Sequence, residues 1–516
     1  MSEPSDNLIN DPFADDAHSE TPSESDSHEL LLERNARLYL TDSGLKVYDP
    51  GVHPRLTFCG LSLRTSSAIQ TVPYHNILSA NLTTDPSGPI LTIIHALPTS
   101  KSAVRPSYIT YPLPKTSVPT TERLISTLLS RAYPPRVQRQ KRIKVLINPL
   151  GGRGLAPTLY ARDVEPILLA AGCDVDVETT THVGHAKEIA AALDTDRYDV
   201  IACCSGDGTP HEVFNGLALH ERPRRALRKV AVAQLPCGSG NAMCRNLLGT
   251  DSPSVAALAL VKGERRALDL MRISQGEERY WSFLSQSVGI VAESDLGTDN
   301  IRWMGAARFT YGFLVRLLGK TVYPAEVSVK VEEAEKEGIR VGYKRKRYGE
   351  VNGEEEEQRE VRDDQGLERS RFGAISDPVP SDWETRDMPT LGNFYCGNMA
   401  WMSTDAPFFA AALPNDGLMD MVNIDGAIKR HVSIKLLLSV EKNQFFNQKE
   451  VNYRKVSAYR ITPRLRPDQK EGFISVDGER VPFEPLQAEV VSGLGTVLSV
   501  AGSAYDFEGP PARNES

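Results

Sequence analysis

The stretch DVIACCSGDGTPHEVFNGLAL, residues 199–219, joins a short apolar run to a glycine turn and a helix-like segment. Val, Ile, Ala and Cys fill the first part, which is typical of a strand buried on both faces of a sheet. Thr209 is a suitable N-cap and Pro210 suits the first helical position, so the sequence predicts a helix that begins directly after Gly208. Strand, glycine turn and helix in this order form the repeating unit of a parallel α/β sheet.

The same unit occurs at two further places in the chain. RIKVLINPLGGRG, residues 142–154, and KVAVAQLPCGSGNAM, residues 229–243, each pass from an apolar strand into a glycine loop. We therefore predict a three-layer α/β domain with a parallel sheet over residues 140–266. The carboxyl ends of parallel strands meet at one edge, where ligands bind in such folds, so all three glycine loops are expected there.

Composition divides the rest of the chain, which at 516 residues is too long for a single hydrophobic core. Residues 1–29 are acidic and contain no Lys or Arg, so we predict a disordered tail. Residues 30–135 alternate short apolar runs with turns before one helix, which indicates a small β-rich region in the order of a pleckstrin-like module. Residues 332–383 are highly charged and are predicted to be a disordered insertion, and residues 506–516 a C-terminal tail.

Charge, hydropathy and cysteine spacing exclude several classes of protein. The formal net charge of −8 gives no general attraction to nucleic acid, which is not an expected partner. The first residues carry no signal-peptide pattern and no apolar run reaches the roughly 18 residues of a membrane span, so a cytoplasmic location is expected. The 7 cysteines form no CxxC pair, which argues against a zinc site and a disulfide framework.

Glycine loops ahead of helices suit phosphate groups, because their N–H groups can approach oxygen atoms closely and the helix adds a positive dipole end. Taken singly, each loop is equally explained by the steric demands of a tight turn, whereas three together favour a phosphate site. The loops match neither the Walker pattern GxxxxGK[ST] nor the dinucleotide pattern GxGxxG. Asp207, between Gly206 and Gly208, would repel phosphate unless it had a task there. A carboxylate beside the γ-phosphate of a nucleotide can accept the proton of an attacking hydroxyl group.

Five motifs in family order resemble the diacylglycerol-kinase-like catalytic superfamily, and within it most closely the sphingosine (sphingoid long-chain-base) kinases. The resemblance extends from Arg142 to Val500, about two-thirds of the chain. The motifs are VLINPLGGRG, SGDGTPHEVFNGL, LPCGSGNAM, GIVAESDLGTDNIRWMGAARFTYG and FISVDGER. The resemblance implies a C-terminal antiparallel β-sandwich domain over residues 267–505, with ATP bound in the cleft between this domain and the α/β domain.

The resemblance also implies an activity and its residues. It implies a lipid kinase that transfers the γ-phosphate of ATP, with Mg²⁺, to the primary hydroxyl of sphingosine, dihydrosphingosine or phytosphingosine. Asp207 matches the general base, and Asp295, with its neighbour Glu293, matches the acidic site for the amine head group. Asp477 and Glu479 match residues near the magnesium ion, which they would contact directly or through water. The positions that match the ATP site are Asn148, Gly151, Gly152, Arg153, Thr180, Ser205, Gly206, Gly208, Gly238, Ser239, Gly240, Asn241, Arg302, Arg308, Asp477, Gly478 and Glu479.

Asp295 supports this substrate class from the residues alone. It closes SFLSQSVGIVAESDLG, a largely apolar stretch, and a carboxylate at the rim of an apolar pocket suits a cationic amine with an alkyl tail. Two solvated acids at a helix N-terminus are the alternative interpretation. In one departure from the family, Leu150 and Leu155 stand where many members carry basic residues, which leaves Arg153 as the only cation of the first glycine loop.

The motif SGDGTP is also similar to the GGDGT of diacylglycerol and NAD kinases. A kinase for ceramide, diacylglycerol or NAD therefore remains an alternative, and so does a non-catalytic lipid-binding adaptor. Because a sphingoid base lies in a bilayer, reversible peripheral membrane contact is expected without a visible anchor. The sequence leaves open whether the chain forms a homodimer.

Overall fold

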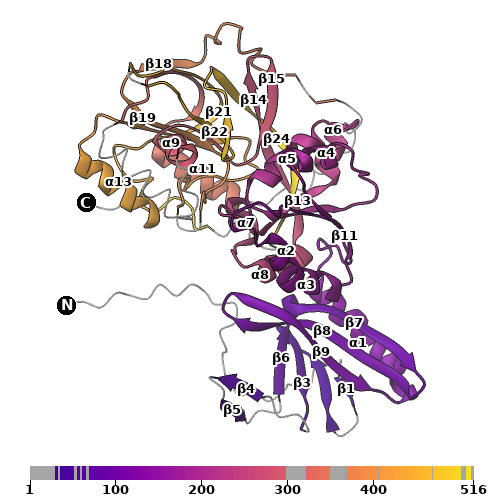
Figure 1. Cartoon of the computed structure of the whole chain (residues 1–516). Helices are drawn as coiled ribbons and strands as arrows, with labels where there is room; N and C mark the ends of the chain where they lie inside the picture. Colours follow the sequence, from indigo (N-terminus) through magenta and orange to yellow (C-terminus); the bar gives the residue numbers. More distant parts are fainter. Residues whose placement is uncertain are drawn as a thin grey trace, which may run out of the picture. The chain divides into compact units, whose positions relative to one another are not determined.

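The computed structural model divides the chain into two compact units (Figure 1). The first comprises residues up to 74 with 80–92 and 109–131, and the second comprises 75–79, 93–108 and all residues from 132 onward. The structure describes residues 29–32, 35–50, 55–58, 61–64, 69–297, 321–348, 366–367, 369–403, 406–467, 469–500 and 507–512. The predicted disordered tail therefore lies outside the described residues apart from Glu29, and so do Arg302 and Arg308.

The N-terminal region is β-rich, as predicted. An antiparallel sheet has the order β1 (Glu29–Leu31), β2 (Arg37–Leu40), β3 (Gly44–Tyr48) and β6 (Ile69–Pro73). The other elements are the pair β4 (Arg55–Phe58) and β5 (Leu61–Arg64), a sheet of β7 (Ile77–Asp85), β8 (Gly88–Ser100) and β9 (Ala103–Pro112), and the helix α1 (Val118–Ala132). Leu38 and Leu40 are buried at alternate positions of β2, which is the period of a sheet with one covered face.

The predicted parallel sheet is confirmed, with a glycine loop at the carboxyl end of three of its strands. The strands pair in parallel in the order β11 (Asp174–Thr179), β10 (Arg142–Ile147), β12 (Val200–Ser205) and β13 (Ala231–Pro236). Every residue of β12 and β13 is buried, which explains their unbroken apolar sequences.

Helices cover both faces of this sheet. In Figure 1, α4, α5 and α6 lie on one side of it, and α2, α3 and α8 lie on the other. The helical elements are α2 (Ala156–Leu159), a π-helical turn (Tyr160–Val164), α3 (Glu165–Ala170), α4 (His185–Ala191), α5 (Gly208–Leu217), α6 (Pro223–Lys229), α7 (Ala242–Leu248) and α8 (Pro253–Lys262). Because α5 begins at Gly208, Asp207 occupies its N-cap position, and the prediction of Thr209 as the N-cap is wrong by two residues.

The C-terminal antiparallel region continues the parallel sheet through one long strand, β24 (Leu486–Ser499). β24 is parallel to β13 and antiparallel to β14 (Glu264–Gln275) and β21 (Asn452–Pro463). The predicted domain boundary between residues 266 and 267 thus falls inside β14. Because β24 pairs with strands of both regions, the two regions share one sheet.

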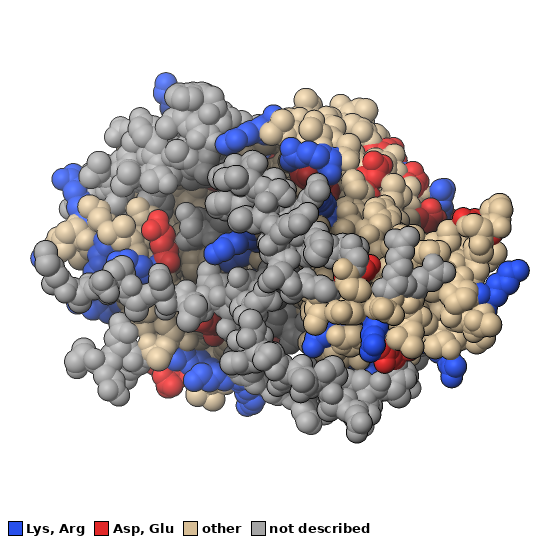
Figure 2. All heavy atoms as spheres, turned by 90° about the horizontal axis from the view of Figure 1, so that it is seen from below, with Lys and Arg blue, Asp and Glu red and all other residues tan. Residues whose placement is uncertain are grey.

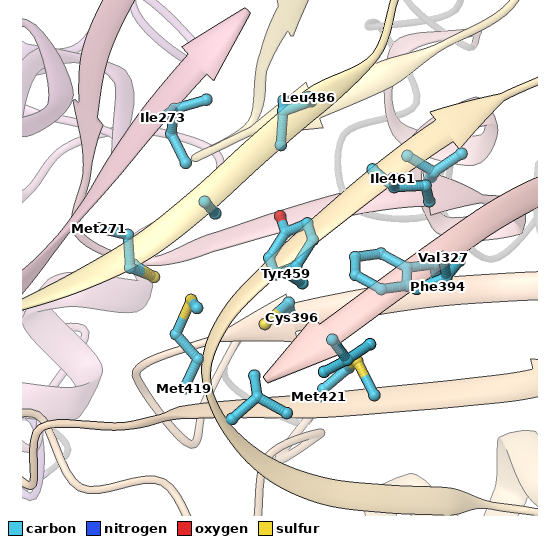
Figure 3. Close-up of a cluster of buried hydrophobic side chains, with 14 of the residues drawn as sticks. Met271, Ile273, Val327, Phe394, Cys396, Met419, Met421, Tyr459, Ile461 and Leu486 are labelled. Carbon is cyan, nitrogen blue, oxygen red and sulfur yellow. The ribbon is translucent and has the colours of Figure 1, made fainter. Parts of the chain in front are cut away.

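Beyond β21, the strand order is β20 (Met419–Asp425), β19 (Leu391–Gly397), β16 (Ser285–Gly289), β22 (Ile474–Val476) and β23 (Glu479–Val481). β15 (Glu278–Ser282) pairs with β14, and β17 (Ala325–Glu333) pairs with β21 and β18 (Glu384–Met388). Three helices of this region are α9 (Ile290–Leu296), α11 (Lys336–Tyr348) and α13 (Arg430–Glu441). Its core is a cluster of buried side chains such as Met271, Phe394 and Tyr459 (Figure 3).

Part of the predicted disordered insertion is a helix, which corrects that prediction. α11 lies within residues 332–383, and its Ile339 and Tyr343 are buried in an apolar cluster that also contains Val440 of α13. These two residues are four positions apart in an otherwise charged segment. Two apolar residues are too few to indicate an amphipathic helix from the sequence alone.

Two further segments carry more contacts than their composition suggested. Within residues 369–383, the hydroxyl of Ser370 donates to Glu489 Oε2 at 2.9 Å. In the predicted C-terminal tail, Phe507 is buried, and its carbonyl accepts a hydrogen bond from the Tyr343 hydroxyl at 3.2 Å. Both bonds join residues more than 100 positions apart, so local composition gave no sign of them.

Basic and acidic side chains alternate over the described part of the face shown in Figure 2. Neither sign forms a broad field there. Among the residues that the structure describes, no helix is both long and apolar enough to span a membrane.

Candidate active site

Three glycine loops meet at the carboxyl edge of the parallel sheet, as the repeated motif predicts. A methyl group on Gly238 would stand 2.3 Å from the Cα of Gly206, and one on Gly206 would stand 2.9 Å from the carbonyl oxygen of Gly240. Gly152, with φ +59°, packs in the same way against Gly238, at 3.1 Å. The loops therefore contact one another through backbone atoms, which only glycine permits.

The first loop is organised by Asn148, at the end of β10. Its side-chain Oδ1 accepts a hydrogen bond from the Leu150 N–H at 3.0 Å, which is the closure of an Asx turn. Thr180, the first residue after β11, is buried and donates its hydroxyl to the Ile147 carbonyl at 3.3 Å. Asn148 and Thr180 thus support the loop, whereas Arg153 at its tip is exposed.

Asp207 connects the second loop to the third. One carboxylate oxygen accepts the N–H of Ala242 and the other accepts the N–H of Met243, each at 3.0 Å, in the first turn of α7. Burial raises the pKa of Asp207, and the hydrogen bonds from Met243, Ala242 and Gln234 oppose this without reversing it. The carboxylate is therefore fixed in direction and is a stronger base than an exposed aspartate.

The third loop is closed by Asn241. Its Oδ1 accepts the Gly238 N–H at 3.1 Å, and its Nδ2 donates to the Gly238 carbonyl at 3.2 Å. In the second loop, the buried Ser205 donates its hydroxyl to the Gly206 carbonyl at 2.8 Å. Ser239 is exposed at the tip of the third loop. Asn241 and Ser205 thus hold the shape of their loops.

The turn between β22 and β23 carries a fully buried carboxylate, that of Asp477. Asp477 has φ +53° and accepts five hydrogen bonds at 2.6 to 3.1 Å. The donors are the Ser282 hydroxyl, the backbone N–H groups of residues 283–285 and the ring of His211. With so many protein donors, this carboxylate acts as the anchor of the turn.

His211 joins this turn to the helix that follows Asp207. Its Nδ1 lies 2.8 Å from Asp477 Oδ2, across 266 positions of sequence. Burial alone would lower the pKa of His211, but the hydrogen bond to Asp477 and its charge, with those of Glu479 and Glu212, raise the pKa above 6.5. Sequence reasoning missed this pair, because no local pattern links a helix to a turn so far away.

Two further acids lie at the Asp477 turn, and one of them, Glu479, also lies beside a glycine loop. A methyl group on Gly208 would stand 2.5 Å from Glu479 Oε1, and one on Gly478 would stand 4.0 Å from Asp295 Oδ2. The buried Tyr395 has a pKa raised by burial and by the charges of Asp295, Asp207 and Asp477. Asp207, Asp295 and Glu479, which come from three distant segments, therefore lie in the same region of the fold.

Comparisons with known proteins agree with this geometry. The family model "Diacylglycerol kinase catalytic domain" matches residues 142–273. Sphingoid long chain base kinase 4 of Schizosaccharomyces pombe is 30% identical over 445 residues, which cover 86% of this chain and 91% of that protein. The chain belongs to the sphingoid long chain base kinase family.

Other relatives in this kinase family differ in how much of their length is matched. Sphingoid long chain base kinase 5 of Saccharomyces cerevisiae is 36% identical over 438 residues, 75% of this chain and 63% of that protein, so less than two-thirds of it is covered. Human sphingosine kinase 1 is 28% identical over 368 residues, 68% of this chain and 89% of that protein. A second family model, "Domain of unknown function (DUF7493)", matches residues 28–134, which include nearly all of the β-rich region.

Glu293 contacts other groups than Asp295 does. Its carboxylate accepts the Tyr323 hydroxyl and lies 3.9 Å from Arg466 Nη1. Residues two apart on a helix point in nearly opposite directions, so Glu293 and Asp295 of α9 point to different sides of the helix. The structure thus brings only one of the two predicted head-group acids to the Asp477 turn.

An apolar pocket lies beside the same helix in this kinase fold. Its space, with the open mouth included, is about 660 Å³. Ile290 and Val291 of α9 line it, together with residues of β19, β20 and α13 such as Asn393, Ile424 and Val440. Asp295 lies at the other end of α9, about 7 Å along the helix axis from Ile290. One short helix therefore contributes to an apolar pocket at its start and places an acid near its end.

Proposed function

We propose that this chain is an ATP-dependent lipid kinase that transfers the γ-phosphate to the primary hydroxyl of a sphingoid base, giving the 1-phosphate. The observation that carries the proposal is the position of Asp207, whose carboxylate is fixed where three glycine loops meet. The names of the relatives support the same reaction.

Asp207 is the proposed general base. Its oxygens accept the two backbone N–H groups and a hydrogen bond from Gln234, which leaves a lone pair of the carboxylate for a hydroxyl proton. In the step we propose, the O–H bond of the lipid breaks and its proton passes to Asp207. The lipid oxygen forms a bond to the γ-phosphorus, and the bond to the bridging oxygen breaks to release ADP. A raised pKa brings this carboxylate closer to the range in which a base works well near neutral pH.

The glycine loops are the proposed phosphate site. Their close packing leaves peptide N–H groups and the start of α5 as the groups available to phosphate oxygens, since the first N–H groups of α7 already bind Asp207. Gly151, Gly152, Gly206, Gly208, Gly238, Ser239 and Gly240 would contact ATP directly, with Asn148, Thr180, Ser205 and Asn241 supporting their loops. Arg153, Arg302 and Arg308 are proposed to neutralise phosphate charge, on the strength of the family resemblance.

Magnesium, when bound, would neutralise charge on the transferring phosphates. Mg²⁺ usually takes one or two carboxylates and keeps several waters and phosphate oxygens. Among the described residues no group of three or more His, Cys, Asp or Glu side chains could hold a metal ion, so the protein would contribute few ligands. Glu479 is exposed beside Gly208 and fits this role directly or through water. Asp477 does not fit as a direct ligand, since its carboxylate is enclosed by five donors.

Asp295 and the apolar pocket are the proposed determinants of substrate class. A sphingoid base carries one cationic amine and one long alkyl chain, and each methylene that the pocket covers contributes about 0.8 kcal/mol. A neutral diacylglycerol or ceramide would leave the charge of Asp295 without a cationic partner from the lipid. The pocket and this acid therefore favour a single-chain amine, with reversible membrane contact while the lipid is extracted.

The test is transfer of labelled phosphate from ATP by the purified protein. The acceptors are sphingosine, dihydrosphingosine, phytosphingosine, ceramide and diacylglycerol, with NAD as a soluble control. We expect label on the three free bases and none on the others. Label on ceramide or diacylglycerol alone would overturn the assignment of Asp295, and no label on any acceptor, with ATP still bound, would favour a non-catalytic adaptor.

A substitution tests the base itself. Asp207→Asn should lower turnover by about 10²- to 10⁴-fold while ATP binding is retained. Asp174→Asn, at an exposed position on the edge strand β11, is the matched control. Thermal unfolding of both variants shows whether the α7 contact survives. Wild-type turnover in a folded Asp207→Asn protein would remove Asp207 from this role.

A further inference from the structure

The outer face of α13 combines exposed apolar side chains with basic ones. Ile434 and Leu438 are 40% and 53% exposed, and they lie one helical turn apart on the same face. Among the described residues, they are the only exposed large hydrophobic side chains that share a helix. Such a pair in water points to a partner that covers it.

The charges around this pair identify the kind of partner. Four basic residues at or next to α13 are exposed, against one exposed acid on the helix, Glu441. The basic residues are Lys429, Arg430, Lys435 and Lys442. Apolar side chains between basic ones are typical of helices that lie in the interface of an anionic bilayer, with the apolar groups among the lipids and the basic groups at the head groups.

The adjacent face of the same helix lines the apolar pocket. Leu436, Leu437 and Val440 of α13 face that pocket, while Ile434 and Leu438 face outward. The pocket and the outer face thus lie on two sides of one helix.

We propose that the outer face of α13, defined by Lys429, Arg430, Ile434, Lys435, Leu438 and Lys442, is the surface that docks on an anionic membrane and opens the pocket to its lipid. The docking surface does not depend on catalysis, but its part in substrate delivery rests on the proposed function. Binding and activity are therefore measured separately.

The binding test uses the full-length protein and vesicles that contain no substrate. One set is phosphatidylcholine alone, and the other is phosphatidylcholine and phosphatidylserine in equal parts. We expect binding to the anionic vesicles only, and we expect it to weaken as salt is added. One basic residue near an anionic surface contributes about fivefold to binding. Because Lys435→Glu removes such a residue and also introduces an acid, it should weaken vesicle binding by more than this. Lys187→Glu, at an exposed position on α4, should leave it unchanged.

The apolar pair has its own variant and control. Ile434→Ser with Leu438→Ser should reduce binding to anionic vesicles at least tenfold. Leu169→Ser with Leu219→Ser removes two similarly exposed side chains elsewhere, 57% and 64% exposed, and should leave binding unchanged. Circular dichroism and thermal unfolding identify any variant that fails to fold, and Lys435→Glu tests the same surface without altering its apolar residues.

Activity separates this proposal from the proposed function. Sphingosine in detergent micelles should be phosphorylated equally by wild type and the α13 variants, whereas sphingosine in anionic vesicles should be phosphorylated more slowly by the variants. Unchanged vesicle binding in both α13 variants would overturn the docking surface. If the wild-type protein is a dimer and the α13 variants are monomers, the outer face is the contact with a second copy of the chain instead. No activity in either form of substrate, with vesicle binding intact, would overturn the proposed function alone.

Discussion

The glycine loops and the apolar pocket are built in opposite ways. At the loops, Gly206 and Gly238 approach one another through backbone atoms, and a single added methyl group has no space. At the pocket, Leu436 and Val440 present side chains to an open space of about 660 Å³. A surface of backbone atoms is fixed in shape, so it suits a ligand that never varies, such as a phosphate chain. A surface of side chains can be changed one residue at a time, so it suits lipid tails of different lengths.

The strongest test of this contrast is Gly238→Ala. The added methyl would stand 2.3 Å from backbone atoms of Gly206, which cannot rotate away, so we expect unfolding free energy to fall by more than about 3 kcal/mol. Kinase activity should be lost even where the protein still folds. The control is Gly342→Ala in α11, where open space surrounds the added methyl group. Because alanine favours a helix more than glycine does, it should raise the unfolding free energy by up to about 1 kcal/mol. Urea denaturation measures both, and equal effects would show that the loops are not rigid.

The next largest effect is expected at the link between α5 and the Asp477 turn. His211→Gln keeps a donor but removes the positive charge from a buried partner, so stability should fall by about 2 kcal/mol near pH 6. Because the pKa of His211 is raised in the folded state, this contribution is complete below about pH 6.5 and is lost as pH rises through the raised pKa. The difference in unfolding free energy between wild type and His211→Gln should therefore become smaller at alkaline pH. A difference that does not depend on pH would contradict a charged His211–Asp477 pair.

Asp295 and Glu293 test whether the structure assigns the right acid to the head group. Asp295→Asn should raise KM for sphingosine roughly tenfold or more, because an amine loses its charged acceptor, with little change in KM for ATP. Glu293→Gln should leave KM for sphingosine near the wild-type value, since its carboxylate is held by Tyr323 and Arg466. The reverse result would mean that α9 turns by half a rotation when the lipid binds.

The smallest effect is expected on the side-chain surface. Leu436→Ala enlarges a pocket that already has open space, so kcat/KM should fall only a few-fold for a long-chain base, by about 1 kcal/mol or less in binding. The control is a sphingoid base with the same head group and a shorter alkyl chain, for which kcat/KM should fall less. A loss as large as that of Gly238→Ala would erase the contrast between the two surfaces.

Local patterns accounted for the features that lie within one unit of strand, loop and helix. β10, β12 and β13 and the position of Asp207 follow from apolar runs that end in glycine, since burial on both faces and a tight turn each act over a few residues. The helix α11 could not be predicted, because only Ile339 and Tyr343 mark its buried face. The shared sheet could not be predicted either, because its pairing through β24 joins segments more than 200 residues apart.

The sequence by itself determined the parallel sheet, the three glycine loops and the aspartate set among them, because each depends on neighbouring residues. Only the tertiary structure decided that His211 meets Asp477, that Glu479 lies against Gly208, and that Asp295 rather than Glu293 lies beside Gly478. Those contacts join segments separated by long stretches of chain. The register of β22 and β16 and the rotation of α9 fix them, and neither is written in any local pattern.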